Sequence, residues 1–529
     1  MHGPTEAANM EGVARRSMWL STLRSTQHNM QAMQALLPQA GALRLPELLR
    51  ELVRPRTVAL TAAAAALLVA WSRRQRRLAV NHFPEVPLRS TLPLLLAPDK
   101  IVETVEKWAK EYGEEGAYEY TLLGERVVVC CSWPVLAEVF AMRPFKVTRP
   151  TGYARLGFTQ DINGAFFSEG KQWSFHRRLV APGFNERNVR SYFPAMHMVT
   201  KNLLAQLDAA AAAGRPANFT SLMRRLAADV ISKVAFSDDL GSLASDSQDL
   251  VDVSTLLDAI MQRLLSPVPY WWLPGLARLL DGGDAALARL RRKAIRLLEG
   301  QADESTLLAK LAAFEDGKLS RDGLIGSLVE LFLAGTETTS YSLTWACYEL
   351  SQQPELQRQA AAEVTAAAPG GITSGEQLEA MHLVRAVWLE TLRCRSVAPF
   401  LDLESAEPMV VAGRRQPAGT LFWLLTREAT RRSPAVQQTL GRDLDSFRPG
   451  RWLGPSGVLE CPPFDSLPFG HGARLCLGKN FAHLEGTLVL ALLLQRFELL
   501  AWEGPAMEER MGFVLMPAKP LELRLRPRT

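Results

Sequence analysis

The stretch Pro468-Phe469-Gly470-His471-Gly472-Ala473-Arg474-Leu475-Cys476-Leu477-Gly478 decides how the rest of this sequence is interpreted. Its three glycines allow the backbone to pass close to a flat or bulky group. An apolar, helix-forming run at 477–497 follows, and the N-terminal dipole of a helix favours the thiolate form of a cysteine placed just before it. Cys476 therefore suits a metal-binding sulfur, although a structural cysteine beside a turn is the simpler interpretation of the loop taken alone.

The composition of this 529-residue chain is that of an ordinary globular protein, with 47% hydrophobic and 22% charged residues. Six scattered cysteines show no CxxC spacing, so a zinc ribbon, a thioredoxin-like motif or a disulfide scaffold is not supported. The net charge of +5 is concentrated in residues 1–82, which contain eleven arginines, no lysine and four acids. Because the remainder is slightly acidic, the main body is not expected to bind nucleic acid.

Residues 1–82 have the features of a targeting or membrane-anchoring segment. Residues 1–56 are rich in Arg, Ala and Ser and poor in acids, which fits either an organellar presequence or an extended tail. Residues 58–71 are uncharged and alanine-rich, and arginines follow closely. This run is shorter than the ~20 residues of a usual spanning helix, but its basic flank favours a short or interfacial membrane helix. Pro84 and Pro87 then block helix continuation and mark the start of a second domain, 83–529.

Helical periodicity dominates residues 83–529, with short β-like runs at 118–123, 126–131 and 409–411. A long helix is expected at 320–352, and its middle reads Ala334-Gly335-Thr336-Glu337-Thr338-Thr339. Glycine and threonine are poor choices for helix stability, and hydroxyls there can bond back to carbonyls and leave room for a small ligand. Glu337 and Thr338 form a plausible proton-relay pair; the alternative is a helix that tolerates a polar patch.

Trp173 and Arg177 are separated by four residues, so an indole and a guanidinium share one helical face. Such a pair can clamp an anionic group, because arginine supplies a fork of donors and the indole N–H adds another. A surface cation–π contact is the alternative.

Glu390 and Arg393 lie three residues apart on a helix expected at 376–394, where they can form an ion pair. Apolar neighbours at 389 and 392 indicate partial burial, and a buried pair needs further partners. Arg451 is the candidate for that third partner.

Taken together, these places resemble the motifs of the cytochrome P-450 family over residues 83–529. The resemblance is carried, in the family's order, by Trp173 and Arg177, by 334–339, by Glu390 and Arg393, by Phe447, Pro449 and Arg451, and by 469–478. It implies a mainly α fold with small β-sheets (α+β), in which haem lies between the family's long helix I and the Cys loop that precedes helix L.

The resemblance also implies the roles of single residues around haem b (iron protoporphyrin IX). Cys476 is the implied axial iron ligand. The implied partners of the haem propionates are Trp173, Arg177 and Arg474, and Phe469 is expected to pack beside the thiolate. Thr338 and Glu337 are expected to hold water and deliver protons for oxygen activation. The implied structural triad consists of Glu390, Arg393 and Arg451.

Two positions depart from the family's pattern. The family often has a basic residue, which contacts a propionate, at the place occupied here by Leu403. Either that contact is missing or another residue such as Arg395 supplies it. Gly450 stands where an acid is common, which is expected to loosen the segment around Arg451.

The implied function is a membrane-associated monooxygenase that inserts one atom of O2 into a lipophilic substrate. No flavin or iron–sulfur module follows the haem domain, so electrons from NAD(P)H are expected through a flavoprotein reductase or, in an organelle, a ferredoxin. The endoplasmic reticulum is the first expectation for its location, with a plastid or mitochondrion as the alternative.

Two other functions stay open at this point: a haem-thiolate isomerase or dehydratase that needs no reductase, and a catalytically silent haem-binding protein. The presence of Thr338 beside Glu337 favours the monooxygenase, because such isomerases often lack the threonine. Substrate contacts are expected at Phe158, Phe332, Ala334, Phe400 and Phe513. Their apolar character indicates a lipophilic substrate but does not distinguish a fatty acid from a sterol, terpenoid or carotenoid.

Overall fold

The computed structural model describes residues 82–528, apart from positions 92, 123, 159, 160, 267, 268, 300–306, 308–320 and 461–466. These residues belong to one compact unit, Ala79–Thr529. The membrane helix expected at 58–71 lies outside the described residues. Within the described ranges, none of the helices combines the length and the apolar character that crossing a bilayer requires.

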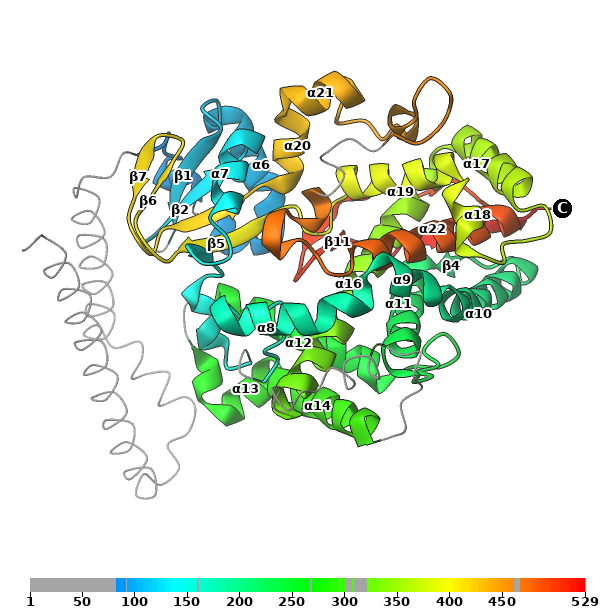
Figure 1. The fold of residues 1–529 in the computed structure, drawn as a ribbon, viewed down its shortest axis with the longest axis horizontal. Coiled ribbons are helices and arrows are strands. Elements are labelled where there is room, and N and C mark those ends of the chain that lie inside the picture. The colour runs from blue at the N-terminus through cyan, green and yellow to red at the C-terminus, as the bar shows by residue number, and fades with distance from the viewer. Residues whose placement is uncertain are drawn as a thin grey trace, which may run out of the picture. The chain divides into compact units, whose positions relative to one another are not determined.

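The largest sheet gathers with α6 and α7 at one end of the unit, on the left of Figure 1. Its strand order is β1-β2-β8-β5-β3, with β2 and β8 parallel and the other neighbours antiparallel. Small two-stranded sheets accompany it, so the expected mainly α fold with small β-sheets is confirmed. The strands are β1 (Ala117–Leu122), β2 (Glu125–Cys130), β3 (Val147–Thr148), β4 (Ala217–Asn218), β5 (Leu401–Ser405), β6 (Met409–Val411), β7 (Arg414–Gln416), β8 (Leu421–Leu424), β9 (Phe497–Leu499), β10 (Glu509–Met511), β11 (Leu515–Pro517), β12 (Glu522–Leu523) and β13 (Leu525–Pro527).

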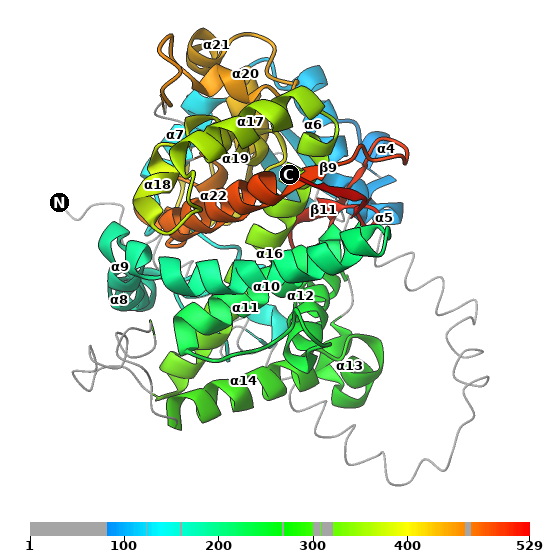
Figure 2. The same cartoon turned by 90° about the vertical axis from the view of Figure 1, so that its right-hand side faces the viewer.

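The long helix α16 (Arg321–Ser351) runs through the helical part of the unit and is buried on nearly every face. Figure 2 shows α10 and α11 on one side of it and α17, α19 and α22 on the other. A Cβ atom on Gly335 would lie 2.9 Å from Ile231 of α11, so this glycine permits the close approach of α11. The glycine that weakens the helix locally therefore serves helix packing.

The helix expected at 376–394 is divided in two. Met381 departs from helical geometry, and the Glu363 carboxylate accepts the backbone N–H groups of Leu383 (2.8 Å) and Val384 (3.0 Å). Those bonds satisfy donors at the start of a new helix, which explains the break. The two helices are α18 (Gly375–Glu379) and α19 (His382–Cys394).

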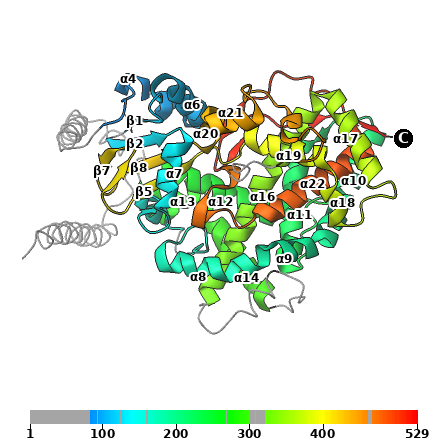
Figure 3. The same ribbon diagram turned by 45° about the horizontal axis from the view of Figure 1, so that its top comes forward.

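Of the remaining helices, α12, α14 and α22 also contact α16, and Figure 3 shows α22 lying close to α16 and α19. The remaining helices are α4 (Leu88–Thr91), α5 (Pro93–Leu96), α6 (Ile101–Tyr112), α7 (Trp133–Ala141), α8 (Gly170–Val180), α9 (Glu186–Ser191), α10 (Phe193–Ala212), α11 (Phe219–Phe236), α12 (Gln248–Leu265), α13 (Pro274–Leu280), α14 (Gly283–Glu299), α17 (Pro354–Ala367), α20 (Thr426–Arg432), α21 (Pro434–Leu440) and α22 (Lys479–Arg496).

Candidate active site

The cysteine loop is a tight structure closed by its own backbone. Gly470 (φ +82°) and Gly472 (φ +70°) both adopt left-handed conformations that favour glycine. The backbone N–H of Cys476 donates to the carbonyl of Phe469 (2.9 Å), and α22 begins three residues later at Lys479. The loop therefore holds the sulfur just before a helix, as the apolar run after Cys476 predicted.

The Cys476 side chain is exposed, although protein atoms packed around its thiol affect its pKa. Burial raises its pKa, while the backbone N–H of Gly478 and the positive charge of Arg177 act in the opposite direction. Of the five cysteines that the structure describes, Cys476 alone is exposed. A sulfur with a donor, a nearby cation and free surface is suited to coordinate a metal as thiolate.

Three predicted side chains come together around this loop. On α8, Arg177 donates from Nη1 to the carbonyl of Leu475 (2.5 Å), and the Trp173 ring packs 4.4 Å from the guanidinium carbon of Arg474. Arg474 also donates to the carbonyl of Ser168 (2.8 Å) and pairs with Glu169. The structure thus brings Trp173 and Arg177 to the loop of Arg474 and Cys476, although about 300 positions separate the two pairs in sequence.

The donors at this loop exceed the acceptors that the protein supplies. The Nε atom of Arg474 is buried without a hydrogen-bond partner, and so are Nε and Nη2 of Arg143. Burial and the charge of Arg149 lower the pKa of Arg474 to about 10, while Glu169 opposes that shift. Orphaned, crowded guanidinium groups require an anion, so the site fits the two carboxylates of a haem.

With haem bound, Cys476 would hold the iron, Trp173, Arg177 and Arg474 would hold the propionates, and Phe469 would pack beside the sulfur. The ring of Phe469 already packs edge-on against His483 (5.1 Å between centroids), which fixes its orientation. Haem with a thiolate ligand supplies the chemistry of dioxygen activation. The protein's part is to orient that group and to control the protons around it.

One face of α16 is accessible in its middle although the helix is otherwise buried. Ala334 is exposed and Thr338 is partly exposed, one turn apart on the same face. The Thr338 hydroxyl donates to the carbonyl of Ala334 (2.7 Å), the back-bonding that the sequence predicted. Thr336 makes the same bond to Phe332 (2.7 Å) but is fully buried. The open face therefore carries the Thr338 hydroxyl.

Glu337 is turned toward α11 and α12. Its carboxylate forms an ion pair with Arg224 of α11 (3.0 Å), and Arg224 also bonds to Ser254 of α12. Burial raises the pKa of Glu337, with repulsion from Asp258 adding to it and Arg224 opposing it. The two predicted relay residues thus have different surroundings: Thr338 faces open space and Glu337 sits in a buried ion pair.

The predicted triad is assembled around Glu390. Its carboxylate accepts from Arg393 (2.8 Å), from Arg451 Nε (2.9 Å) and from the Trp452 indole (2.9 Å). Glu390, Arg393 and Trp452 are buried, and the side chain of Arg451 is only 5% exposed. Beyond its chain neighbours, no atom lies within 4 Å of the place where a Cβ of Gly450 would stand, so a Cβ there would make no packing contact.

The five predicted substrate-pocket residues have different environments. Ala334 lies on the open face of α16, and Phe513 packs near Phe166 (6.3 Å between centroids). The others pack inside the protein: Phe158 stacks under Arg263 (3.9 Å), Phe332 lies against Phe236 (6.4 Å), and Phe400 stacks on Trp423 (4.9 Å).

Several residues of the site were missed by the sequence analysis. Glu330 of α16 is buried and accepts the backbone N–H groups of Phe166 and Phe167, which pins that loop to the helix. Glu169 joins the same loop to Arg474. The sequence gives no spacing signal for these contacts, because Glu330 and Phe166 are 164 positions apart and Glu169 and Arg474 are 305 positions apart.

Comparison with known proteins identifies the family. The family model described as cytochrome P-450 matches residues 82–525. The mitochondrial sterol 26-hydroxylase of Oryctolagus cuniculus is 31% identical over 69% of this chain and 72% of its own length. The mitochondrial 25-hydroxyvitamin D-1 alpha hydroxylase of Homo sapiens is 31% identical over 68% and 75%. The chloroplastic protein LUTEIN DEFICIENT 5 of Arabidopsis thaliana is 27% identical over 69% and 64%.

The matched residues include every motif that carried the resemblance, and the site geometry fits haem and a thiolate ligand. The expected monooxygenase function, with O2 and an external electron supply, is confirmed by the family and by relatives named as hydroxylases. This chain belongs to the cytochrome P-450 family of haem-thiolate monooxygenases.

Proposed function

We propose that this chain hydroxylates a lipophilic substrate at haem b held by Cys476, inside an organelle, with electrons that pass from NAD(P)H through a ferredoxin. The observation that carries the proposal is that Trp173, Arg177 and Arg474 lie around the loop of Cys476, in a site with several unpaired hydrogen-bond donors. The open face of α16, with the Thr338 hydroxyl, supports proton delivery by the protein.

An organelle is favoured over the endoplasmic reticulum, which none of the three relatives reported above supports by name. Those relatives are named mitochondrial or chloroplastic. The cationic character of residues 1–82 is compatible with import. In this proposal, residues 1–82 form a targeting or anchoring segment, and residues 83–529 form the haem domain.

A ferredoxin is supported by a groove beside the cysteine loop. The groove has a volume of about 300 Å³, and its charged lining consists of Arg190, Arg385 and Lys479 together with Glu186 and Glu379, which both pair with Arg190 (2.7 Å each). Lys479 begins α22, three positions after Cys476, so a protein bound there would be close to the sulfur. The three cations outnumber the two acids, and this small excess of positive charge suits an acidic electron carrier, because complementary charge steers association.

Contact with a membrane surface is supported by an exposed apolar segment between α12 and α14. The exposed side chains are Trp272 (57%), Leu273 (59%), Leu279 (80%) and Leu280 (51%). Large apolar groups clustered on one segment mark interaction surfaces, and a lipophilic substrate is delivered most directly from a membrane. The relatives' names, which include a sterol and a vitamin D derivative, make sterol-like molecules the first substrates to screen.

Purified protein tests the proposed chemistry. The reduced, CO-bound form should show a thiolate-type Soret band, and Cys476→Ala should abolish it. Product formation with NADPH should require a ferredoxin and its reductase, whereas a flavoprotein reductase alone should be ineffective. Product formation without any reductant would instead establish an isomerase.

Vesicle binding tests the membrane proposal. Replacing Leu279 and Leu280 by serine should lower cosedimentation with phospholipid vesicles severalfold, because about 25 cal/mol is lost for each Å² of apolar surface no longer buried. The matched control replaces Val410 and Val458, which are also exposed but lie elsewhere, by serine. Equal binding by both variants would contradict the proposal.

A fluorescent fusion of residues 1–90 would report the organelle.

A further inference from the structure

The place where the family often has a basic propionate contact carries an apolar residue here. Leu403 lies in β5, is 1% exposed and packs in the core of the sheet. The substitute considered from the sequence, Arg395, is engaged elsewhere: it pairs with Glu349 (2.8 Å) and Glu509 (3.2 Å) and packs over Trp345 (4.6 Å). Another cation must therefore serve if the contact exists.

Arg143 reaches the same region from a different element. It follows α7 and its backbone N–H donates to the carbonyl of Phe140 (3.1 Å). The end of α7 packs on the cysteine loop: the Phe140 ring lies 5.8 Å from His471, and a Cβ on Gly472 would lie 3.9 Å from the Phe140 carbonyl oxygen. The side chain of Arg143 thus begins beside the loop that holds Cys476.

The charges around Arg143 place its guanidinium close to the missing contact. Repulsion from Arg149 and Arg474 and attraction from Glu169 and Asp402 all act on it. Leu403 packs in the same apolar cluster as Phe140, three positions before Arg143, and Asp402 precedes Leu403 in β5, so Arg143 lies beside the strand that lacks the cation. Arg143 and Leu403 are far apart in sequence but serve one region of the site.

The two neighbouring arginines have partners, and Arg143 has none among the described residues. The Arg149 side chain donates to the carbonyl of Phe166, and the Arg149 backbone N–H donates to Glu169 (3.1 Å). Arg474 takes the other oxygen of Glu169. The Nε and Nη2 atoms of Arg143 are buried without any acceptor. A buried guanidinium with no partner is costly unless a ligand supplies the acceptor.

The electrostatics agree with this geometry. Burial, together with repulsion from Arg149 and Arg474, lowers the pKa of Arg143 to about 9. An anion bound between these side chains would reverse the repulsion. Glu169 is already shared by Arg149 and Arg474, and Asp402 attracts Arg143 through its charge without a hydrogen bond or ion pair to it among the described residues, so neither acid occupies the place of that anion.

We propose that Arg143 binds a haem propionate in this chain and replaces the basic residue that is absent at position 403. The inference rests on the proposed haem site and adds a residue that none of the family's motifs in this sequence includes. A propionate bound to Arg143 would give its two unpaired nitrogen atoms an acceptor. It would also account for the absence of a cation at position 403 of β5.

Haem retention tests the proposal without any need for substrate. Wild-type protein and Arg143→Gln are loaded with haem or with haem dimethyl ester, whose propionates carry no charge, and haem loss to excess apomyoglobin is followed. Arg143→Gln should lose haem about tenfold faster than wild type, because a hydrogen bond to a charged group is lost. With the dimethyl ester, the two proteins should lose the cofactor at equal rates.

Two further variants complete the experiment. Lys146→Gln removes a nearby cation that pairs with Glu407 at the surface, and its haem loss should match wild type. Arg143→Lys, which keeps the charge, should recover part of the retention. Equal acceleration with haem and with its ester would show a structural role and overturn the proposal, as would unchanged retention in Arg143→Gln.

The apoprotein supplies a second readout of opposite sign. Because the unpaired guanidinium destabilises the apoprotein, Arg143→Gln should leave its thermal midpoint unchanged or raise it, while lowering the midpoint of the haem-loaded protein. A lowered apoprotein midpoint would overturn the proposal. Absence of haem binding in wild type would refute the proposed function as well, whereas normal binding with no effect of Arg143→Gln would refute this inference alone.

Discussion

At the scale of single residues, the site depends on which hydroxyl or carboxyl faces open space. Thr336 and Thr338 make the same hydrogen bond to the carbonyl four residues earlier. Of the two, Thr338 lies on the accessible face of α16, because two residues advance a helix by about 200° and so place Thr336 on the opposite face. This difference separates a structural threonine from one that can serve a proton relay.

Replacing each threonine by valine tests that distinction. Thr338→Val should lower product formation at least tenfold, because proton delivery by a positioned group contributes factors of that order or more. Thr336→Val has the same change of atoms at a buried position and should retain most of the activity. Product yield per NADPH consumed and haem content are measured for both. Similar loss in both variants would mean that the effect is one of helix stability.

Glu330 gives a prediction for the dependence of stability on pH. Its carboxylate is buried, and burial raises its pKa to about 7, although the N–H groups of Phe166 and Phe167 oppose this shift. The unfolded chain releases this proton near the usual pKa of a glutamate, and the folded protein releases it only near pH 7. Stability contributed by Glu330 therefore falls as pH rises between about 4.5 and 7, by at most about 3 kcal/mol.

Thermal unfolding at pH 5 and pH 8 measures that slope. Glu330→Gln has no proton to release, so its midpoint should fall less than that of wild type between the two pH values. Glu114→Gln removes one charge from an exposed position and should keep the wild-type slope. A wild-type slope in Glu330→Gln would show that this carboxyl titrates normally.

At the scale of elements, Glu390 joins α19 to the segment that follows α21. It accepts the backbone N–H of Arg448 (2.9 Å) and the side chains of Arg393 and Arg451, and Arg451 also donates to the carbonyl of Leu440 (2.5 Å). This segment contains little regular structure of its own. Its position is therefore set by charge-assisted hydrogen bonds to one buried carboxylate.

Arg451→Met should cost about 3–5 kcal/mol of unfolding free energy, since it leaves part of a buried charge unpaired. Arg448→Met is the matched control: Arg448 is more than half exposed and pairs with Asp443 at the surface (3.2 Å), so its loss should cost less than about 1 kcal/mol. The thermal midpoint and the yield of haem-loaded protein report both effects. Equal midpoints for the two variants would contradict a structural role for the triad.

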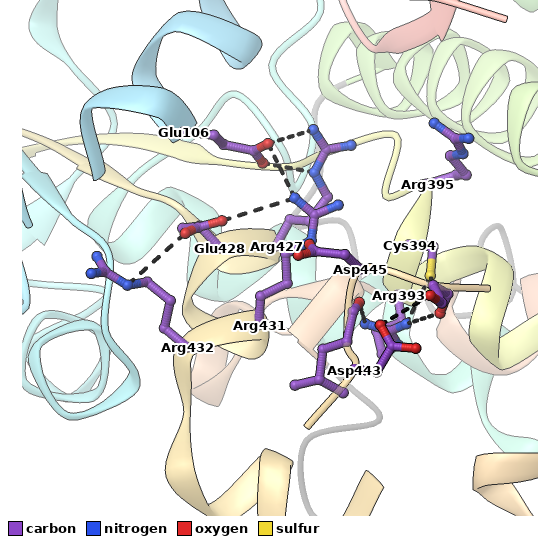
Figure 4. A network of polar contacts seen from close by, with 12 residues as sticks. Glu106, Arg393, Cys394, Arg395, Arg427, Glu428, Arg431, Arg432, Asp443 and Asp445 are labelled. Atoms are coloured by element: carbon purple, nitrogen blue, oxygen red, sulfur yellow. Dashed lines mark hydrogen bonds and ion pairs between the residues drawn. The ribbon is translucent and has the colours of Figure 1, made fainter. Parts of the chain in front are cut away.

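At the scale of the whole compact unit, buried ion pairs connect the sheet end to the central helix. Arg427 of α20 pairs with Glu106 of α6 (2.7 Å) and Glu509 of β10 (2.9 Å), and Arg395 links Glu509 to Glu349 of α16. Figure 4 shows Glu106 beside Arg427. Burial lowers the pKa of Arg427, but the two acids outweigh it and raise the pKa overall.

Arg427→Met should lower the free energy of unfolding by about 3–5 kcal/mol, because the largely buried carboxylates of Glu106 and Glu509 lose their shared partner. The difference in unfolding free energy between wild type and Arg427→Met should change little with added salt, because buried ion pairs are weakly screened. Arg415→Met, at an exposed position of β7, should change stability by less than about 0.5 kcal/mol. Denaturant unfolding at low and high ionic strength distinguishes these outcomes; an Arg427→Met midpoint equal to that of Arg415→Met would contradict the prediction.

The parts of the site predicted from sequence are those with short, regular spacing. Trp173 and Arg177 share a helical face, Glu390 and Arg393 are one turn apart, and Cys476 follows its glycines directly. The predicted strands agree with β1, β2 and β6 within a residue, and the long helix agrees with α16. The break between α18 and α19 was missed because its cause, Glu363, lies on another helix.

Motifs with short spacing were enough to assign the family, the cysteine that ligates the cofactor in the proposed site, and the elements that carry the main motifs, because these depend on local geometry. Three contacts became visible only in the folded protein: Glu337 is held by Arg224, Glu330 binds the loop at 166–167, and Nε and Nη2 of Arg143 have no acceptor. The physical reason is burial. Exclusion of water makes each unpaired charge costly, and which charges meet is settled by helices that are distant in the chain.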